Sequence, residues 1–215
     1  MGIKKTMLKS GYFVYYVFLI AGALVLLLTE KGDFLLWLNE HHNSSLDIFF
    51  KYWTHLGDGL IFAVFILIFL MTNYYRAILL ALATITQTLV IQGMKRLIFD
   101  DSVRPKLFFE NFENLYSIPG VDVHTANSFP SGHTATAFTI AVILALMMKK
   151  NTLTALLMMM AILVGISRVS LLQHFFVDIY FGSLIGFLNG AIVFFVLESS
   201  RWNDKSSLKK GLVWK

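Results

Sequence analysis

Long apolar stretches alternate with short polar segments along most of the 215-residue chain. Six of the stretches approach or reach the length of about 20 residues that a membrane-spanning helix requires. They lie near residues 11–29, 57–73, 75–98, 131–149, 152–169 and 174–198. The pattern predicts an all-α, polytopic membrane protein with six transmembrane helices, folded as a single membrane-embedded domain over residues 1–215.

Two segments between these stretches, 30–56 and 99–130, are not expected to span. Within the first, apolar side chains recur with the i, i+3, i+4, i+7 spacing of an amphipathic helix: Leu46, Phe49, Phe50 and Trp53. We expect this helix to lie in the membrane interface on the extracytoplasmic side. The second segment is polar at both ends and aromatic in the middle, and we expect it to fold over a site at the membrane surface.

Composition supports the membrane assignment and excludes other classes. The chain is 57% hydrophobic and only 14% charged, which is more apolar surface than a soluble domain of this length can bury. It has no cysteine, which excludes disulfides and thiolate metal sites. The net charge is +5, but the basic residues gather at the ends of the apolar stretches, so we interpret them as topology signals and not as a nucleic-acid site.

The distribution of Lys and Arg predicts the orientation. If both termini lie on one side, that side holds most of these residues: Lys4, Lys5, Lys9, Arg76, Lys149, Lys150, Arg201, Lys205, Lys209, Lys210 and Lys215. By the positive-inside rule this side is cytoplasmic. The 94–130 loop, His133, Arg168 and His174 then face outward. In a bacterium this describes a multi-pass protein of the cytoplasmic (inner) membrane whose active site faces the periplasm.

A first group of polar residues, Pro130-Ser131-Gly132-His133, stands at the start of the fourth apolar stretch. Serine is a common helix N-cap, and a glycine in the first turn lets an anion approach the free backbone N–H groups. His133 would project beside such an anion. Taken alone, the same four residues also fit an ordinary helix start with an interfacial histidine.

A second group joins the last two stretches: Arg168 ends the fifth, His174 opens the sixth, and Asp178 follows four residues later. A carboxylate one helical turn from a histidine can accept a hydrogen bond from one ring nitrogen and leave the other as a nucleophile. The alternative is that Asp178 only pairs with a nearby base to lower its cost of burial. Because a charged side chain within a membrane is costly, the functional interpretation of Asp178 is the first one to consider.

Basic residues also crowd the outer end of the third stretch: Lys95, Arg96, Arg104 and Lys106. Arginine offers a planar fork for phosphate oxygens, whereas lysine offers a point charge. Some of these side chains, Arg96 and Lys106 first among them, are also placed to reach lipid headgroups.

Together these residues resemble the signature of the type 2 phosphatidic acid phosphatase superfamily, which is related to the vanadium haloperoxidases. That signature has a lysine followed by Arg-Pro, then Pro-Ser-Gly-His, then Ser-Arg with five residues to His and three to Asp. The second part is complete at 130–133 and the third at Ser167, Arg168, His174 and Asp178. The first part departs from the pattern, because eight residues rather than six separate Lys95 from Arg104-Pro105. The signature region covers 95–178.

The resemblance implies a mechanism. His174, held by Asp178, attacks phosphorus and forms a phosphohistidine, while His133 protonates the leaving oxygen and then activates water. The phosphate group is bound by Lys95, Arg104, Ser131, Gly132 and Arg168. The resemblance implies neither a metal nor another cofactor.

The sixth stretch also carries a row of glycines at four-residue spacing, Gly182, Gly186 and Gly190. Small residues at this spacing allow helices to approach closely in lipid. We expect the row to pack the sixth helix against the fourth and to fix the separation of the two histidines. A glycine-lined homodimer interface is the alternative, so the chain is expected to be a monomer or a homodimer.

The leading functional hypothesis is a phosphatase that hydrolyses a lipid phosphate or diphosphate at the outer leaflet. The candidate substrates are phosphatidic acid, phosphatidylglycerol phosphate, undecaprenyl diphosphate and the phosphates of lipid A. A lipid phosphotransferase is the nearest alternative, because a second lipid hydroxyl can replace water. A non-catalytic lipid transporter is a more distant one, since polar residues at depth are confined to Thr84, Thr86, Gln87 and Thr88.

Overall fold

The computed structural model describes residues 10–112, 115–200, 202 and 205–213. Some of the Lys and Arg residues that predict the orientation lie outside this described part: Lys4, Lys5, Lys9, Arg201 and Lys215. Helices account for most of it, and the only extended pairing there is an isolated bridge between Val103 and Ala126. The prediction of an all-α fold is confirmed.

The long helices follow the apolar stretches closely. They are α2 (Phe13–Leu28, after the short turn η1, Ser10–Tyr12), α5 (Gly59–Thr72), α6 (Tyr74–Gly93), α8 (Gly132–Met148), α9 (Asn151–Ser170) and α10 (Phe176–Ser199). A π-helical turn, η3 (Met94–Ile98), extends α6. Shorter helices are α3 (Asp33–Glu40), α4 (Ser44–Trp53), η2 (Thr54–Gly57), α7 (Pro105–Phe108) and η5 (Ser206–Lys209).

Length and composition identify fewer spans than the six predicted. Within the described residues, four helices are long and apolar enough to cross a membrane: Ser10–Leu28, Tyr74–Ile98, Asn151–Ser170 and Phe176–Ser199. A fifth span results if Ser44–Gly57 and Gly59–Thr72, which meet at a bend of 55°, form one broken span. Helix α8 has 17 residues and is shorter. Four to five spans are therefore supported, and the sixth stays a prediction.

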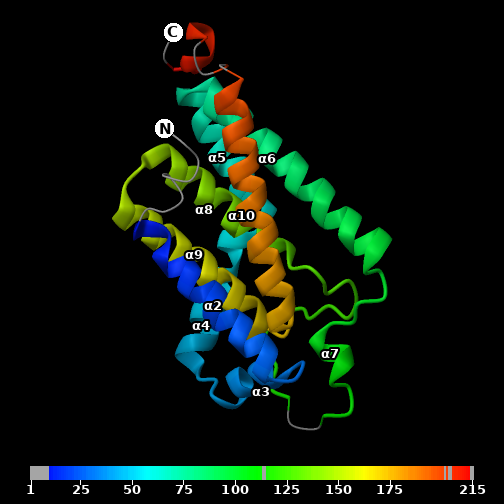
Figure 1. Cartoon of the computed structure of the whole chain (residues 1–215). Coiled ribbons are helices and arrows are strands. Elements are labelled where there is room, and N and C mark those ends of the chain that lie inside the picture. Colours follow the sequence, from blue (N-terminus) through cyan, green and yellow to red (C-terminus); the bar gives the residue numbers. More distant parts are fainter. Residues whose placement is uncertain (1–9, 113–114, 201, 203–204, 214–215) are drawn as a thin grey trace.

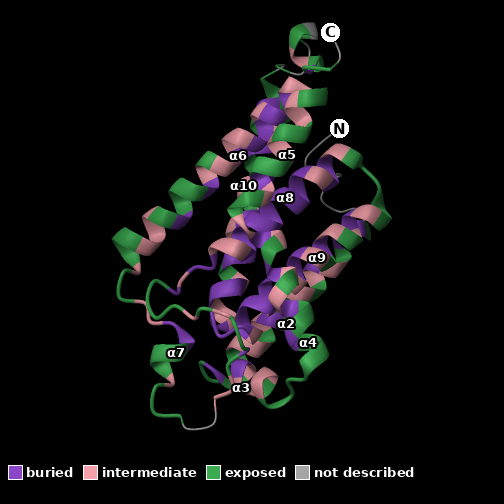
Figure 2. Ribbon diagram, turned by 180° about the vertical axis from the view of Figure 1, so that it is seen from behind, coloured by how far each residue is buried: buried purple, intermediate pink, exposed green. Residues whose placement is uncertain are grey.

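Helix α8 lies at the centre of the bundle, in contact with α5, α6, α9 and α10. Nearly all its residues from Thr134 to Leu146 are buried, whereas the C-terminal half of α6 is largely exposed (Figure 2). The C-terminal end of α10 and the α5–α6 connection lie at one end of the bundle, and α3, α4 and α7 gather at the other (Figure 1). The described part of the 99–130 segment is at that second end.

The glycine row packs α10 against α8, as the sequence predicts. A Cβ atom added to Gly182 would lie 2.7 Å from the carbonyl oxygen of Ser131, and one added to Gly190 would lie 2.8 Å from that of Thr139. At Gly186 the added atom would lie 2.8 Å from Cα of Ala135. All three glycines are buried within the chain. The row therefore serves an intramolecular helix contact and does not form the alternative dimer interface.

The amphipathic pattern in 30–56 does form a helix, α4. Phe50 is buried and the Trp53 indole N–H donates to the carbonyl of Met160 at 3.2 Å, which attaches α4 to α9. Leu46 and Phe49 are exposed, by 43% and 37%, although the pattern places them on the same apolar face. The side of α4 that packs on the protein also includes the buried Asp47, which accepts a hydrogen bond from the Tyr116 hydroxyl at 3.2 Å.

Candidate active site

The start of α8 is built as the sequence predicts. Ser131 is the N-cap, and its hydroxyl oxygen accepts hydrogen bonds from the backbone N–H of Thr134 at 3.4 Å and the Thr134 hydroxyl at 2.9 Å. The backbone N–H of Ser131 donates to the carbonyl of Asp178 at 3.0 Å. This last bond joins the helix start that carries His133 to the first turn of α10.

The second group has a different local structure from the one predicted. His174 does not open α10 but lies in the turn before it, because the helix begins at Phe176. Asp178, in the first helical turn, accepts the backbone N–H of Phe175 at 2.9 Å with Oδ2, as acidic residues near helix N-termini commonly do. The same oxygen lies 3.3 Å from Nδ1 of His174. The two side chains are therefore paired, although His174 lies two residues before the start of α10.

Ser128 completes this arrangement and was not found from the sequence. Its hydroxyl donates to Oδ2 of Asp178 at 2.5 Å, and both residues are buried. The carboxylate thus has three partners, which fixes its position and directs Nε2 of His174 away from it. No motif contains Ser128, although its place two residues before Pro130 was the available signal.

Burial holds the pKa of His174 well below its ordinary value near 6.5. Asp178 opposes this shift, whereas the positive charges of Arg104 and Arg168 add to it. The side chain is only 2% exposed. The imidazole is therefore neutral near pH 7, which is the protonation state that a nucleophile requires.

Arg104 is buried and held by its neighbours on both sides. Its Nε donates to the carbonyl of Ala126 at 2.8 Å, and one terminal nitrogen donates to the backbone and side-chain oxygens of Gln173 at 3.0 and 2.9 Å. Gln173 also donates to the carbonyl of Asp122 at 2.8 Å. The residue directly before His174 thus anchors both Arg104 and the 99–130 segment. Sequence reasoning did not identify Gln173.

Arg168 is buried as well. One terminal nitrogen donates to the hydroxyl of Thr54 at 2.8 Å, and the buried Nε has no hydrogen-bond partner among the described residues. Arg168 and His133 line a cavity of about 280 Å³, whose walls also include Thr54, His55, Asp58, Asp122, His124 and Gln173. His174 itself does not line this cavity, but the adjacent Gln173 does.

Lys95 reaches the site despite the wider spacing of the first motif. It lies in the π-helical turn that follows α6, and its ammonium group donates to the carbonyl of Asn127 at 2.7 Å. Arg96 is exposed. The structure thus directs Lys95, and not Arg96, to the segment that precedes Pro130.

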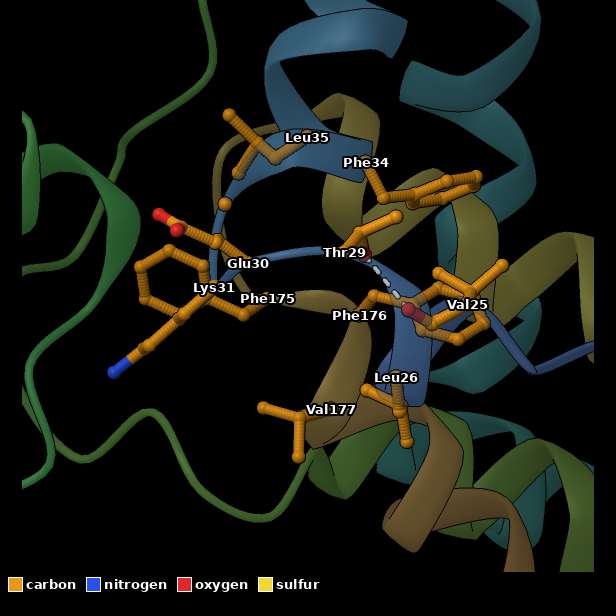
Figure 3. Close-up of a pocket in the computed structure, with 11 residues that line it drawn as sticks. Val25, Leu26, Thr29, Glu30, Lys31, Phe34, Leu35, Phe175, Phe176 and Val177 are labelled. Atoms are coloured by element: carbon orange, nitrogen blue, oxygen red, sulfur yellow. Dashed lines mark hydrogen bonds between the residues drawn. The ribbon is translucent and has the colours of Figure 1, made fainter. Parts of the chain in front are cut away.

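A second cavity, also of about 280 Å³, lies beside Phe175 at the junction of α2, α3 and α10 (Figure 3). Its lining is mainly apolar, with Val25, Leu26, Phe34 and Val177 among the residues drawn. None of the predicted site residues lines it. The first cavity, by contrast, is lined by two of them, His133 and Arg168.

A family model described as the PAP2 superfamily matches residues 76–202, which is more than half of the chain. The chain belongs to the PAP2 superfamily. The matched part contains all three motifs of the signature, so the resemblance inferred from the sequence is confirmed.

Two solved structures share the fold of this PAP2 protein. The crystal structure of Aquifex aeolicus LpxE is 28% identical, with a TM-score of 0.67 over 76% of this chain and 94% of that one. A transmembrane PAP2-type phosphatidylglycerolphosphate phosphatase from Bacillus subtilis is 23% identical, with a TM-score of 0.62 over 92% and 98% of the two chains. The second likeness establishes the fold alone.

Proposed function

We propose that this PAP2 protein is an integral membrane phosphatase that hydrolyses a lipid phosphate or diphosphate at the outer leaflet, without a metal, through a phosphohistidine. Family membership supports the coarser assignment to membrane lipid phosphatases. The observation that carries the proposal is the pair of buried arginines, Arg104 and Arg168, each 8% exposed. Among the described residues neither has a carboxylate within 4.0 Å. Buried charge without a counter-ion is costly, so an anionic ligand is the partner that these side chains lack.

The reaction would proceed in two balanced steps. In the first, Nε2 of His174 attacks phosphorus as the bond to the lipid oxygen breaks, and His133 gives its proton to that oxygen. Asp178 stabilises the positive imidazole ring. In the second, His133 takes a proton from water, whose oxygen attacks phosphorus as the bond to His174 breaks and inorganic phosphate leaves.

The equatorial oxygens of the phosphoryl group would be bound by fixed positive charge and by the start of α8. Arg104 and Arg168 supply planar forks, and Lys95 supplies a point charge. The Ser131 hydroxyl and the Gly132 N–H add neutral donors. Donors placed in advance where charge develops are the main requirement of phosphoryl transfer.

The location of the site supports action at the outer leaflet of a bacterial inner membrane. The site lies at the end of the bundle opposite to the C-terminal end of α10 (Figure 1). Because the positive-inside rule assigns the termini to the cytoplasm, the site then faces the periplasm. Exposed apolar side chains on α4 near this end, such as Leu46 and Ile48, fit a segment lying among lipid headgroups.

The proposal is tested by phosphate release from the four candidate lipids with detergent-purified protein. We expect release by the wild type, none by His174→Ala, and wild-type release by His41→Ala, a control in an exposed histidine outside the site. Brief incubation of the wild type with ³²P-labelled substrate should give an acid-labile, base-stable label on the protein that His174→Ala lacks. Wild-type turnover by His174→Ala would refute the mechanism. Transfer of phosphate to a second lipid, without free phosphate, would instead identify a phosphotransferase.

A further inference from the structure

The turn η2, Thr54–Gly57, connects α4 to α5 and lies against both α8 and α9. Sequence patterns place it at the edge of an interfacial segment and assign it no part in the chemistry. It also lies outside residues 76–202, the part of the chain that the family model matches. In the structure, however, its two ends contact the two helices that carry Arg168 and His133.

The first contact is the hydrogen bond from Arg168 to Thr54. The two residues are 114 positions apart, the donor–acceptor distance is 2.8 Å, and the residues are 8% and 6% exposed. Among the described residues Thr54 provides the one side-chain acceptor for this guanidinium group. Since Nε has no partner, the Thr54 hydroxyl alone fixes the rotation of the fork about its long, flexible stem.

The second contact is the close approach of Gly57 to α8 and α9. A Cβ atom added to Gly57 would lie 2.7 Å from the carbonyl oxygen of His133 and 2.5 Å from Cγ1 of Val164. The turn is therefore held against the backbone of His133 at one end while Thr54 holds Arg168 at the other. Its position relative to both groups is fixed by packing.

We propose that Thr54 is a positioning residue, which orients the guanidinium group of Arg168 so that its remaining N–H groups face the bound phosphoryl oxygens. This inference rests on the proposed function, and it adds the turn η2 to the three segments of the chain that carry the signature motifs. Arginine binds phosphate well only when its planar fork is aligned with the oxygens. Without Thr54 the fork can rotate, and a buried donor of Arg168 loses its acceptor.

The test compares Thr54→Val, which keeps the shape and removes the hydroxyl, with Thr54→Ser, which keeps the hydroxyl. Thr154→Val is the matched control, because Thr154 is also a buried threonine but lies in the first turn of α9 and bonds only to the carbonyl of Lys150. Two readouts are needed: kcat and KM for dioleoyl phosphatidic acid in detergent, and the concentration of orthovanadate that protects each protein from thermal unfolding.

For Thr54→Val we expect kcat/KM and vanadate affinity to fall by about tenfold or more, as for loss of a hydrogen bond to a charged group. The thermal midpoint without vanadate should also fall, because a buried donor of Arg168 loses its acceptor, so kcat/KM and vanadate affinity decide the test. Thr54→Ser should retain both quantities within about threefold, and Thr154→Val should leave them unchanged. If Thr54→Val does not fold, Thr54→Ala provides the same comparison.

Wild-type vanadate affinity in Thr54→Val would overturn the inference, and so would equal losses in Thr54→Ser and Thr54→Val. Vanadate binding separates this failure from a failure of the proposed function. If the wild type binds vanadate but releases no phosphate from any lipid, the proposed hydrolysis is wrong while the comparison of Thr54 variants still holds. If the wild type binds no vanadate, both proposals fail.

Discussion

Replacement of Gly186 by alanine tests how far the catalytic geometry depends on the α8–α10 contact. The added methyl carbon would lie 2.8 Å from Cα and 2.9 Å from the carbonyl carbon of Ala135. Carbon atoms in contact are about 3.5–4.0 Å apart, so the two helices must separate by about 1 Å. The obstructing atoms belong to the backbone of α8, which cannot rotate away as a side chain would.

We expect two effects of Gly186→Ala. Overpacking of this kind costs about 1–3 kcal/mol, which exceeds the gain of up to about 1 kcal/mol from better helix propensity. The separation also lengthens the bond of 3.0 Å between the Ser131 N–H and the Asp178 carbonyl, which aligns the two halves of the site. A misplacement of about 1 Å can reduce turnover by roughly 100-fold.

The matched control is Gly93→Ala, in the last turn of α6, where an added Cβ meets nothing within 4 Å. This change should leave stability equal or raise it by up to about 1 kcal/mol. Thermal unfolding in detergent and phosphate release from a lipid substrate are measured for both variants. A Gly186→Ala protein with the midpoint and turnover of the wild type would show that the glycine row does not fix the site.

Three further predictions concern the charged groups. Turnover should persist in excess EDTA, because Arg104 and Arg168 supply the positive charge; strict dependence on added divalent ions would contradict this. Arg104→Lys keeps the charge but loses the fork bonded to Ala126 and Gln173, so kcat/KM for phosphate release should fall by about 10–100-fold, and the thermal midpoint should fall as well because buried acceptors lose their donor. Because the pKa of His174 is lowered in the fold, the unfolded chain binds a proton first on acidification. Protonation of His174 therefore does not reduce the free energy of unfolding above about pH 6.5, and it reduces it below that pH by at most about 1.4 kcal/mol per pH unit. The thermal midpoint of His174→Asn should accordingly fall less between pH 7 and 5 than that of the wild type.

The parts of the fold that follow from local pattern were predictable from the sequence. Helix α8 is expected from 131 to 149 and runs from Gly132 to Met148, because an apolar run and a serine cap are both local signals. The glycine row on α10 is also local, and in lipid it has few uses other than close helix packing. The amphipathic pattern of α4 is local as well, but periodicity alone does not report that Asp47 is buried with a partner far along the chain.

The remaining features of the site come from pairings across long stretches of chain. Thr54 meets Arg168, Ser128 meets Asp178 and Gln173 meets Arg104, at separations of 114, 50 and 69 residues. Each of these partners is a neutral residue in a turn or loop, where motif spacing carries no signal. Their contribution is orientation, which depends on tertiary packing and not on local propensity.

The two additional residues between Lys95 and Arg104 illustrate how such orientation is maintained when the spacing of a motif changes. After the π-helical turn, the Ser102 N–H bonds to the carbonyl of Phe99 at 3.2 Å, and the Ser102 carbonyl accepts the N–H of Ser128 at 3.0 Å. The Ser102 hydroxyl oxygen also accepts the N–H of Phe129 at 3.2 Å. The longer connection is therefore bonded directly to the segment that positions Asp178. Because the additional length is taken up in this contact, Lys95 and Arg104 both reach the site at the spacing this chain has.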